Sequence, residues 1–142
     1  SSGNLDINRY PEVASKIGEK YPNVQYVAFT LRESISADHN NWGAMLWSKA
    51  GNTVSFAPLQ NGQYKPYRIT DIVDRVGGGD SFAAALLFAM QDKSIKESQD
   101  NIIAFAVAAS CLCHTIEGDI NFTSKDEAVS LMKGNSTGRV SR

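Results

Sequence analysis

Long apolar segments, an excess of charge of one sign and cysteine are all scarce in this sequence. No apolar run approaches the roughly 18 residues that a membrane-spanning helix requires, and we therefore expect no membrane partner. The 14 basic residues nearly balance the 15 acidic ones, and a net charge of −1 argues against a generally cationic protein that binds nucleic acid. This balance does not exclude phosphate binding, because backbone amides bind phosphate without side-chain charge.

The cysteine count and the first residues bear on location. Cys111 and Cys113 are the only cysteines in the sequence, which is too few for a disulfide framework. The first six residues, SSGNLD, lack the basic region and the apolar core of a signal peptide. We therefore expect a cytoplasmic protein.

The common nucleotide-binding fingerprints are also missing. The P-loop ending GK[ST] does not occur. The pattern G-x-G-x-x-G fails from Gly77 onward, because Phe82 stands where the third glycine belongs. A dinucleotide-binding domain is therefore disfavoured.

The order of helix and strand signals predicts the fold class. A chain of 142 residues with 42% hydrophobic content is long enough to bury a core as one domain. Apolar spacing predicts helices over Ile7–Lys20, Ser81–Asp92, Ile95–His114 and Lys125–Lys133. Turn signals occur at Ala50-Gly51-Asn52, Pro58 and Asn61-Gly62. Around them, β-branched and aromatic residues predict strands: one over Val24–Leu31, a hairpin of Ala44–Trp47 with Thr53–Phe56, and a short strand within Tyr67–Val73. This order favours an α/β layered architecture over a helical bundle or a β-sandwich.

The segment Gly77-Gly78-Gly79-Asp80, just before an alanine-rich helix, is the strongest candidate for a functional site. A glycine-rich turn at a helix N-terminus presents several unpaired backbone N–H groups, and the helix dipole adds partial positive charge there. Such a loop can hold an anion. An acid beside it is suited to take a proton from an attacking hydroxyl while the loop holds the transferred group. Phosphoryl transfer depends mostly on positioning and electrostatics, so one loop and one carboxylate can supply much of the catalysis.

A purely structural interpretation stays open for the same segment. Aspartate or serine at a helix start is commonly an N-cap, and glycines before it commonly form a turn. The pattern alone therefore leaves two alternatives, a helix cap and a catalytic base.

The stretch VDRVGGGDSFAAALLFAM (73–90) resembles the C-terminal signature of the ribokinase-like, or PfkB, carbohydrate kinases. The spacing from Asp74 to Asp80 and the small residues after Asp80 agree with that signature, whereas Gly78 stands where the family usually has alanine. The stretches TLRESISADHNNW (30–42), FAVAASCLCHTIEGDINF (105–122) and GNSTGRVSR (134–142) resemble the 2-keto-3-deoxygluconate kinase branch.

The resemblance implies a ribokinase-like three-layer α/β/α fold in which residues 1–142 form the C-terminal, ATP-binding and catalytic-base portion with its β-hairpin. The N-terminal portion, with the substrate-binding and lid elements, has no counterpart in this sequence. The implied reaction is ATP- and Mg²⁺-dependent phosphorylation of 2-keto-3-deoxygluconate at its C6 hydroxyl. Gly77, Gly78 and Gly79 would form the anion hole, and Asp80 would be the base.

The resemblance also implies further nucleotide and cation contacts. Thr30 and Arg32 would lie along the ATP phosphates, together with Gly77 and Gly79. Three small or apolar residues of the second helix would wall the adenine, although core packing between helix and sheet explains them equally well: Ala104, Val107 and Ala108. Asp74, with the loop from His114 to Asp119, matches a position that binds a monovalent cation such as K⁺ in some family members.

Other conspicuous residues have simpler explanations. Cys111 and Cys113 are two apart on a helix and point in nearly opposite directions, so we expect buried small residues rather than metal ligands. His39 is expected at the surface, Trp42 and Trp47 in the hairpin and its packing, and Arg139 and Arg142 in a solvated tail.

Two alternatives for the function remain at this point. The substrate could belong to another PfkB sugar kinase, such as a fructokinase or ribokinase relative. The chain by itself could instead be a catalytically inactive fragment, either nucleotide-binding or structural. Exposed sheet edges would favour a homo-oligomer.

Overall fold

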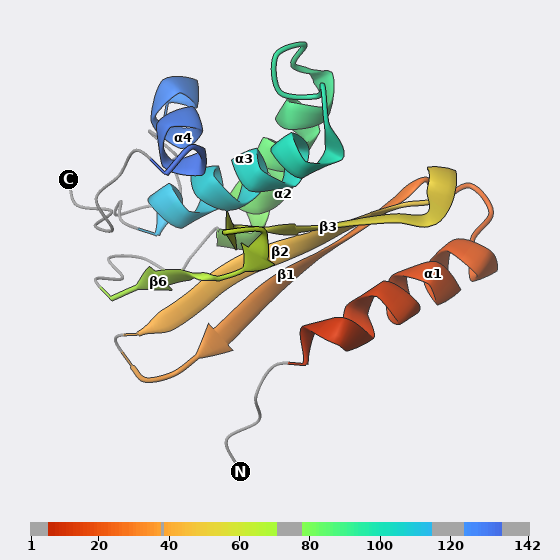
Figure 1. Cartoon of the computed structure of the whole chain (residues 1–142), viewed down its shortest axis with the longest axis horizontal. Coiled ribbons are helices and arrows are strands. Elements are labelled where there is room, and N and C mark those ends of the chain that lie inside the picture. The colour runs from red at the N-terminus through yellow and green to blue at the C-terminus, as the bar shows by residue number, and fades with distance from the viewer. Residues whose placement is uncertain (1–5, 38, 71–77, 115–123, 135–142) are drawn as a thin grey trace.

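The computed structural model describes residues 6–37, 39–70, 78–114 and 124–134, and shows a twisted antiparallel sheet with helices on both faces (Figure 1). The central strand β2 (Asn40–Ser48) pairs along its whole length with β1 (Tyr26–Ser34). Its other edge is shared by β6 (Tyr67–Ile69), which pairs with residues 40–42, and β3 (Thr53–Ala57), which pairs with residues 44–48. The mixed α/β class is therefore confirmed, while the three-layer order of a complete ribokinase-like fold stays a prediction.

The alternation of side chains along β2 builds two separate cores. Trp42, Ala44 and Leu46 lie on the face that packs against the long helices, whereas Met45 and Trp47 lie on the opposite face. This is the two-residue period that places successive strand residues on opposite faces of a sheet.

A short 3₁₀ turn (Ile7–Arg9) and helix α1 (Tyr10–Lys20) cover the Met45 face. Pro11 lies in the first turn of α1, where a missing N–H costs no hydrogen bond. Gly18 is buried on this helix, and a Cβ there would collide with the ring of Trp47. The glycine therefore allows α1 to approach the sheet closely.

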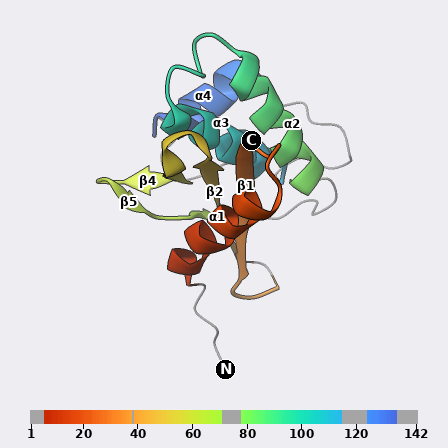
Figure 2. The ribbon, with the colours of Figure 1, turned by 90° about the vertical axis from the view of Figure 1, so that its right-hand side faces the viewer.

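Three helices cover the other face: α2 (Gly78–Gln91), α3 (Gln99–Cys113) and α4 (Lys125–Met132). α3 packs on β2 and β3 and also contacts α2 and α4, so it lies between these two helices (Figure 2). The Gln99 side-chain Nε2 donates to the backbone oxygens of Leu46 (2.9 Å) and Thr53 (3.1 Å), which fixes the start of α3 on the sheet. Ser124 and Glu127 form a capping box at the start of α4.

The structure corrects several predicted boundaries. The helix predicted from Ile95 begins at Gln99, because Ser98 is its N-cap and the Asp92 carboxylate accepts hydrogen bonds from the Ser94 and Ile95 amides before it. The strand predicted over Val24–Leu31 lies at Tyr26–Ser34 instead. The strand predicted over Ala44–Trp47 extends to Asn40–Ser48, since pairing with β1 and β6 continues it.

The predicted turns are confirmed where the structure describes them. A 3₁₀ turn at Ala50–Asn52 joins β2 to β3, as the sequence predicted. Asn61 and Gly62 have positive φ angles of 53° and 76° and connect β4 (Leu59–Gln60) to β5 (Gln63–Tyr64). Of the predicted strand Tyr67–Val73, residues 67–69 form β6, and residues 71–73 lie outside the described part. Across the described ranges, every helix is too short or too polar to cross a bilayer.

Candidate functional site

The start of α2 is open to solvent above a firmly packed first turn. Gly79 and Asp80 are exposed, whereas Ser81 and Phe82 directly after them are buried, and Phe82 lies in the core with Trp42 and the α3 side chains. The first N–H groups of an α-helix have no partner within the helix. Gly79 and Asp80 therefore lie at an accessible surface, in the part of a helix where backbone N–H groups can bind an anion.

Gly79 has no evident role in the fold. Among the residues that the structure describes, a Cβ built on it would meet no other atom within 4 Å, and its φ is not in the positive range that favours glycine. Neither close packing nor backbone conformation requires a glycine at this position. The glycine leaves free space above the first turn, as an anion-binding loop needs.

Asp80 is the third residue of α2 rather than the residue before the helix. Asp80 is therefore not the N-cap residue of α2, because an N-cap residue comes directly before the helix. A carboxylate in the first turn is still stabilised by the helix dipole. The exposed position leaves its oxygens accessible to a substrate hydroxyl.

Thr30 and Arg32 lie on the face of the sheet that carries α2 and α3. Arg32 pairs with Trp42, and Thr30 pairs with Ala44, across β1 and β2. Directly paired residues share a face, and Trp42 and Ala44 belong to the core beneath the long helices. Both Thr30 and Arg32 are exposed on the edge strand. The structure thus places these two predicted phosphate contacts on the same side of the sheet as the start of α2.

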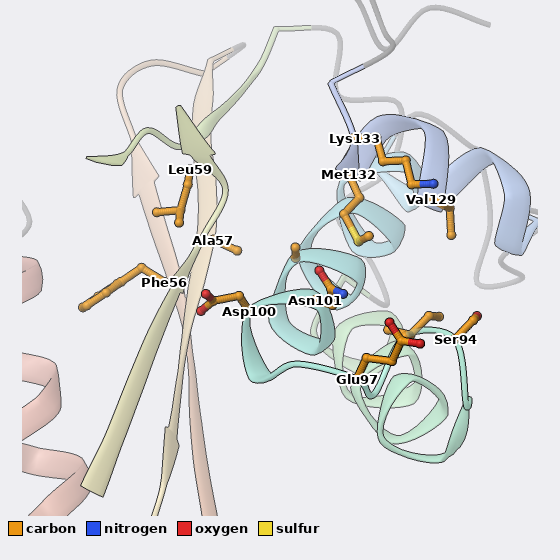
Figure 3. A pocket seen from close by; sticks show the side chains of 12 residues that line it. Phe56, Ala57, Leu59, Ser94, Glu97, Asp100, Asn101, Val129, Met132 and Lys133 are labelled. Atoms are coloured by element: carbon orange, nitrogen blue, oxygen red, sulfur yellow. The ribbon is translucent and has the colours of Figure 1, made fainter. Parts of the chain in front are cut away.

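The three predicted adenine contacts on α3 have different surroundings. Val107 and Ala108 are fully buried in the core, as the packing interpretation expects. Ala104 is half-buried and lines a cavity of about 480 Å³ between α3, α4 and the end of β3. Apolar residues such as Phe56 and Met132 line this cavity together with charged ones (Figure 3). The adenine contact of these three residues stays a prediction.

The end of α3 is held on the sheet by polar contacts that the sequence did not predict. The Trp42 indole Nε1 donates to the Ser110 Oγ at 2.8 Å, and both side chains are buried. The His114 ring contacts the Trp42 ring edge-on with centroids 4.8 Å apart, and its Nδ1 lies 2.7 Å from the Ser110 carbonyl oxygen. These contacts fix the end of α3 above the start of β2.

The remaining candidates behave mostly as expected. Cys111 and Cys113 are buried side chains of α3, and burial raises the pKa of the Cys111 thiol to about 12, so that it stays protonated at neutral pH. His39 is half-buried, with its Nε2 3.1 Å from the Asn41 Oδ1. Trp42 and Trp47 pack on opposite faces of the sheet.

Several predicted site residues lie outside the described part of the chain, so their roles stay predictions. They are Asp74, Gly77, the loop after His114 up to Asp119, Arg139 and Arg142.

No protein-family model and no curated protein sequence matches the chain, but solved structures do. A 2-dehydro-3-deoxygluconokinase from Thermotoga maritima is 38% identical, with a TM-score of 0.77 over 94% of this chain and 36% of that protein. A PfkB family carbohydrate kinase from Listeria grayi is 31% identical, with a TM-score of 0.71 over 94% and 36% of the two chains. A structure from Enterococcus faecalis shares the fold at 23% identity, with a TM-score of 0.69 and coverage of 95% and 35%.

These likenesses extend over nearly all of this chain but over little more than a third of each matched structure. The resemblance to PfkB carbohydrate kinases, and to a deoxygluconokinase among them, is confirmed for that portion.

Proposed function

Because this chain has the structure of one portion of a PfkB-type carbohydrate kinase, we propose that it carries the phosphate-binding and general-base groups of such an enzyme. The reaction would be the transfer of the γ-phosphoryl group of ATP to a hydroxyl of a sugar acid. The main support is the start of α2, where the exposed Asp80 follows Gly79, a glycine with no described atom within 4 Å of the position of a Cβ.

The chemistry assigns separate tasks to the helix and to the acid. The backbone N–H groups at the start of α2 would hold phosphoryl oxygens and stabilise the charge that develops on them. The Asp80 carboxylate would accept the proton of the attacking hydroxyl. The hydroxyl oxygen then forms a bond to the γ-phosphorus as the bond from that phosphorus to the bridging oxygen breaks, and ADP leaves with the bonding electron pair.

Thr30 and Arg32 would meet the phosphates from β1. Arg32 is exposed and forms no ion pair among the described residues, so its guanidinium is available to an anion. A guanidinium binds phosphate oxygens through two parallel hydrogen bonds. Removal of Arg32 would therefore weaken phosphate binding without changing the core.

Magnesium would enter with the nucleotide rather than bind first to this chain. Over the ranges that the structure describes, no three His, Cys, Asp or Glu side chains are close enough to hold a metal ion. Mg²⁺ commonly uses phosphate oxygens and water with only one or two carboxylates. We therefore derive no catalytic step through a metal held by this chain. The K⁺ site that includes Asp74 remains a proposal that rests on the resemblance.

For the substrate we propose 2-keto-3-deoxygluconate, phosphorylated at its C6 hydroxyl. The support is the likeness to the deoxygluconokinase of Thermotoga maritima at 38% identity. The alternative is a fructokinase- or ribokinase-like activity. A panel of these sugars, assayed with a full-length kinase that contains this sequence, distinguishes them by their kcat/KM values.

The first test is calorimetric titration of this chain with ATP and Mg²⁺, with Gly79→Val as the control. We expect binding by the unsubstituted chain and loss of binding in the variant, because the valine side chain fills the free space. Folding of the variant is checked by circular dichroism. Binding that survives Gly79→Val would place the nucleotide elsewhere. Complete absence of binding would favour the alternative of a structural fragment.

A further inference from the structure

Asn40, at the start of β2, has a buried oxygen atom without a partner. The residue is 2% exposed, and its Oδ1 has no hydrogen-bond partner among the residues that the structure describes. A buried acceptor without a hydrogen bond costs roughly 1–3 kcal/mol, and native proteins contain few of them. The residue type does not require this cost, since an apolar side chain would fit a core position at least as well. A group that binds to Asn40 only in a complex would explain why the polar side chain is there.

The strand register places Asn40 among the predicted nucleotide contacts. Asn40 pairs with Ser34 of β1 on one side and with Ile69 of β6 on the other. It lies two residues before Trp42 on the same strand and therefore shares the face of Trp42. Arg32 pairs with Trp42, so Asn40 and Arg32 lie in neighbouring cross-strand rows of one face. Ile69, the direct partner of Asn40, belongs to the same core as Phe82, the fifth residue of α2.

The chemistry of the free atom limits what can bind to it. A carboxamide oxygen accepts hydrogen bonds and cannot donate them. Phosphate oxygens of a nucleotide are themselves acceptors, so they cannot satisfy this atom. The ribose hydroxyls and the adenine amino group are donors. Asn40 is therefore suited to the nucleoside part of ATP, while the start of α2 is suited to its phosphates.

Resting on the proposed function, we propose that the Asn40 side-chain oxygen accepts a hydrogen bond from the nucleoside of the bound nucleotide. The two ends of the nucleotide would then be bound by separate parts of this chain. The phosphates would meet the backbone of α2 and Arg32 of β1. The nucleoside would meet Asn40 at the start of β2.

The test compares two probes, ATP and inorganic tripolyphosphate, by calorimetry on the whole chain with Mg²⁺ present. We expect Asn40→Ala to lower ATP affinity about 10-fold, which is the upper range of one net hydrogen bond, and to leave tripolyphosphate affinity unchanged. Gly79→Val should lower the affinity for both probes. The matched control Asn41→Ala, at the neighbouring half-buried asparagine, should change neither affinity.

A second readout separates ligand binding from a structural role. If Asn40 serves the ligand, Asn40→Leu removes an unsatisfied buried atom, and the chain should unfold at an equal or higher urea concentration while binding ATP more weakly. If Asn40 serves the fold, the same variant should unfold at lower urea and keep its ATP affinity. That second pattern overturns the proposal.

Nucleotide analogues identify the donor. Purine riboside triphosphate lacks the amino group and gains no new donor, and 2′-deoxy-ATP and 3′-deoxy-ATP each lack one hydroxyl. The analogue that lacks the donor should bind the unsubstituted chain and Asn40→Ala equally well. If Asn40→Ala lowers the affinity for ATP and for tripolyphosphate equally, the result contradicts the contact between Asn40 and the nucleoside but not the proposed function. If the unsubstituted chain binds neither probe, the proposed function fails, and this proposal fails with it.

Discussion

Two glycines of this chain differ in what surrounds them, and the difference predicts opposite effects of adding a methyl group. Gly18 is buried against the Trp47 ring, whereas a Cβ at Gly79 meets no atom of the described part of the chain within 4 Å. Gly18→Ala should lower the free energy of unfolding by about 1–3 kcal/mol, because α1 must move away from the sheet. Gly79→Ala should raise it by up to about 1 kcal/mol, because alanine loses less backbone entropy in a helix. Urea unfolding of both variants measures these changes. A loss of stability in Gly79→Ala would contradict the assignment of this glycine to ligand binding.

Asp80 is the residue whose removal separates chemistry from binding. In a full-length kinase that contains this sequence, Asp80→Asn should lower kcat about 10²–10⁴-fold, because the amide cannot accept the hydroxyl proton. ATP affinity should stay similar or rise, since a negative charge leaves the neighbourhood of the phosphates. Steady-state kinetics and calorimetry measure the two effects.

Asp126→Asn is the matched control for this experiment, because Asp126 is likewise an exposed acid in the first turn of a helix, α4. The control should leave kcat unchanged. Near-normal turnover in Asp80→Asn would mean that the carboxylate serves only the helix end.

At the scale of elements, Asp92 joins three helices. It lies directly after α2, accepts hydrogen bonds from the Ser94 amide (2.9 Å) and hydroxyl (2.6 Å) before α3, and forms an ion pair with Lys125 of α4 at 2.9 Å. The side-chain hydrogen bond from Ser94, followed by Lys125, lowers the pKa of Asp92 below its ordinary value of 3.8. Asp92 therefore connects the loop between α2 and α3 to α4 in its ionised form.

This lowered pKa predicts an acid dependence of stability. A carboxylate whose pKa is lower in the folded state stabilises the folded state fully when the pH is above the pKa of the unfolded state. This contribution is lost as the pH falls through the pKa of the folded state. Between about pH 5 and pH 2, the unsubstituted chain should therefore lose stability more steeply than Asp92→Asn. Urea unfolding at several pH values measures both slopes. Glu19→Gln, at an exposed acid of α1 that takes part in no ion pair of the described residues, should follow the unsubstituted chain.

Elements with local signals were predictable from the sequence, whereas elements that depend on distant pairing were not. The Asn61-Gly62 turn, the β2–β3 hairpin and α2 follow from residues within each segment. The hairpin of β1 with β2 was missed, because the residues between Ser34 and Asn40 include neither glycine nor proline. The start of α3 was misplaced because the apolar Ile95 continues the helical spacing, although the Asp92 carboxylate holds it in a turn.

The site divides in the same way. The glycines and the acid at the start of α2 are contiguous in sequence, so the sequence identified them. Asn40 is buried, and it pairs with Ile69 of β6, which lies 29 positions later in the chain. An asparagine after a serine- and histidine-containing loop carries no local sign of that burial. Register between distant strands determines which polar side chains become buried, and a single sequence does not specify that register.

At the scale of the whole molecule, the sheet that the structure describes has an unpaired edge at β1. Among the described strands β1 pairs only with β2, so its nine residues leave one edge free. Figure 2 shows α2 on the β1 side of the long helices, and its Leu87 and Phe88 are 60% and 45% exposed. A free strand edge and exposed apolar side chains are both features of sites where chains associate. Two copies related by a twofold axis could pair their β1 edges in antiparallel orientation and cover these side chains.

We therefore predict that this chain self-associates through the β1 side when it is studied alone. Sedimentation velocity at increasing concentration should show dimers, and Leu87→Glu should shift the distribution toward monomers, because a carboxylate in the contact would have to lose its water. Leu59→Glu is the matched control, since Leu59 is 49% exposed but lies on β4, beyond the opposite edge of the sheet. A monomer at every concentration, or an equal effect of Leu59→Glu, would show that the β1 side does not bind a second copy.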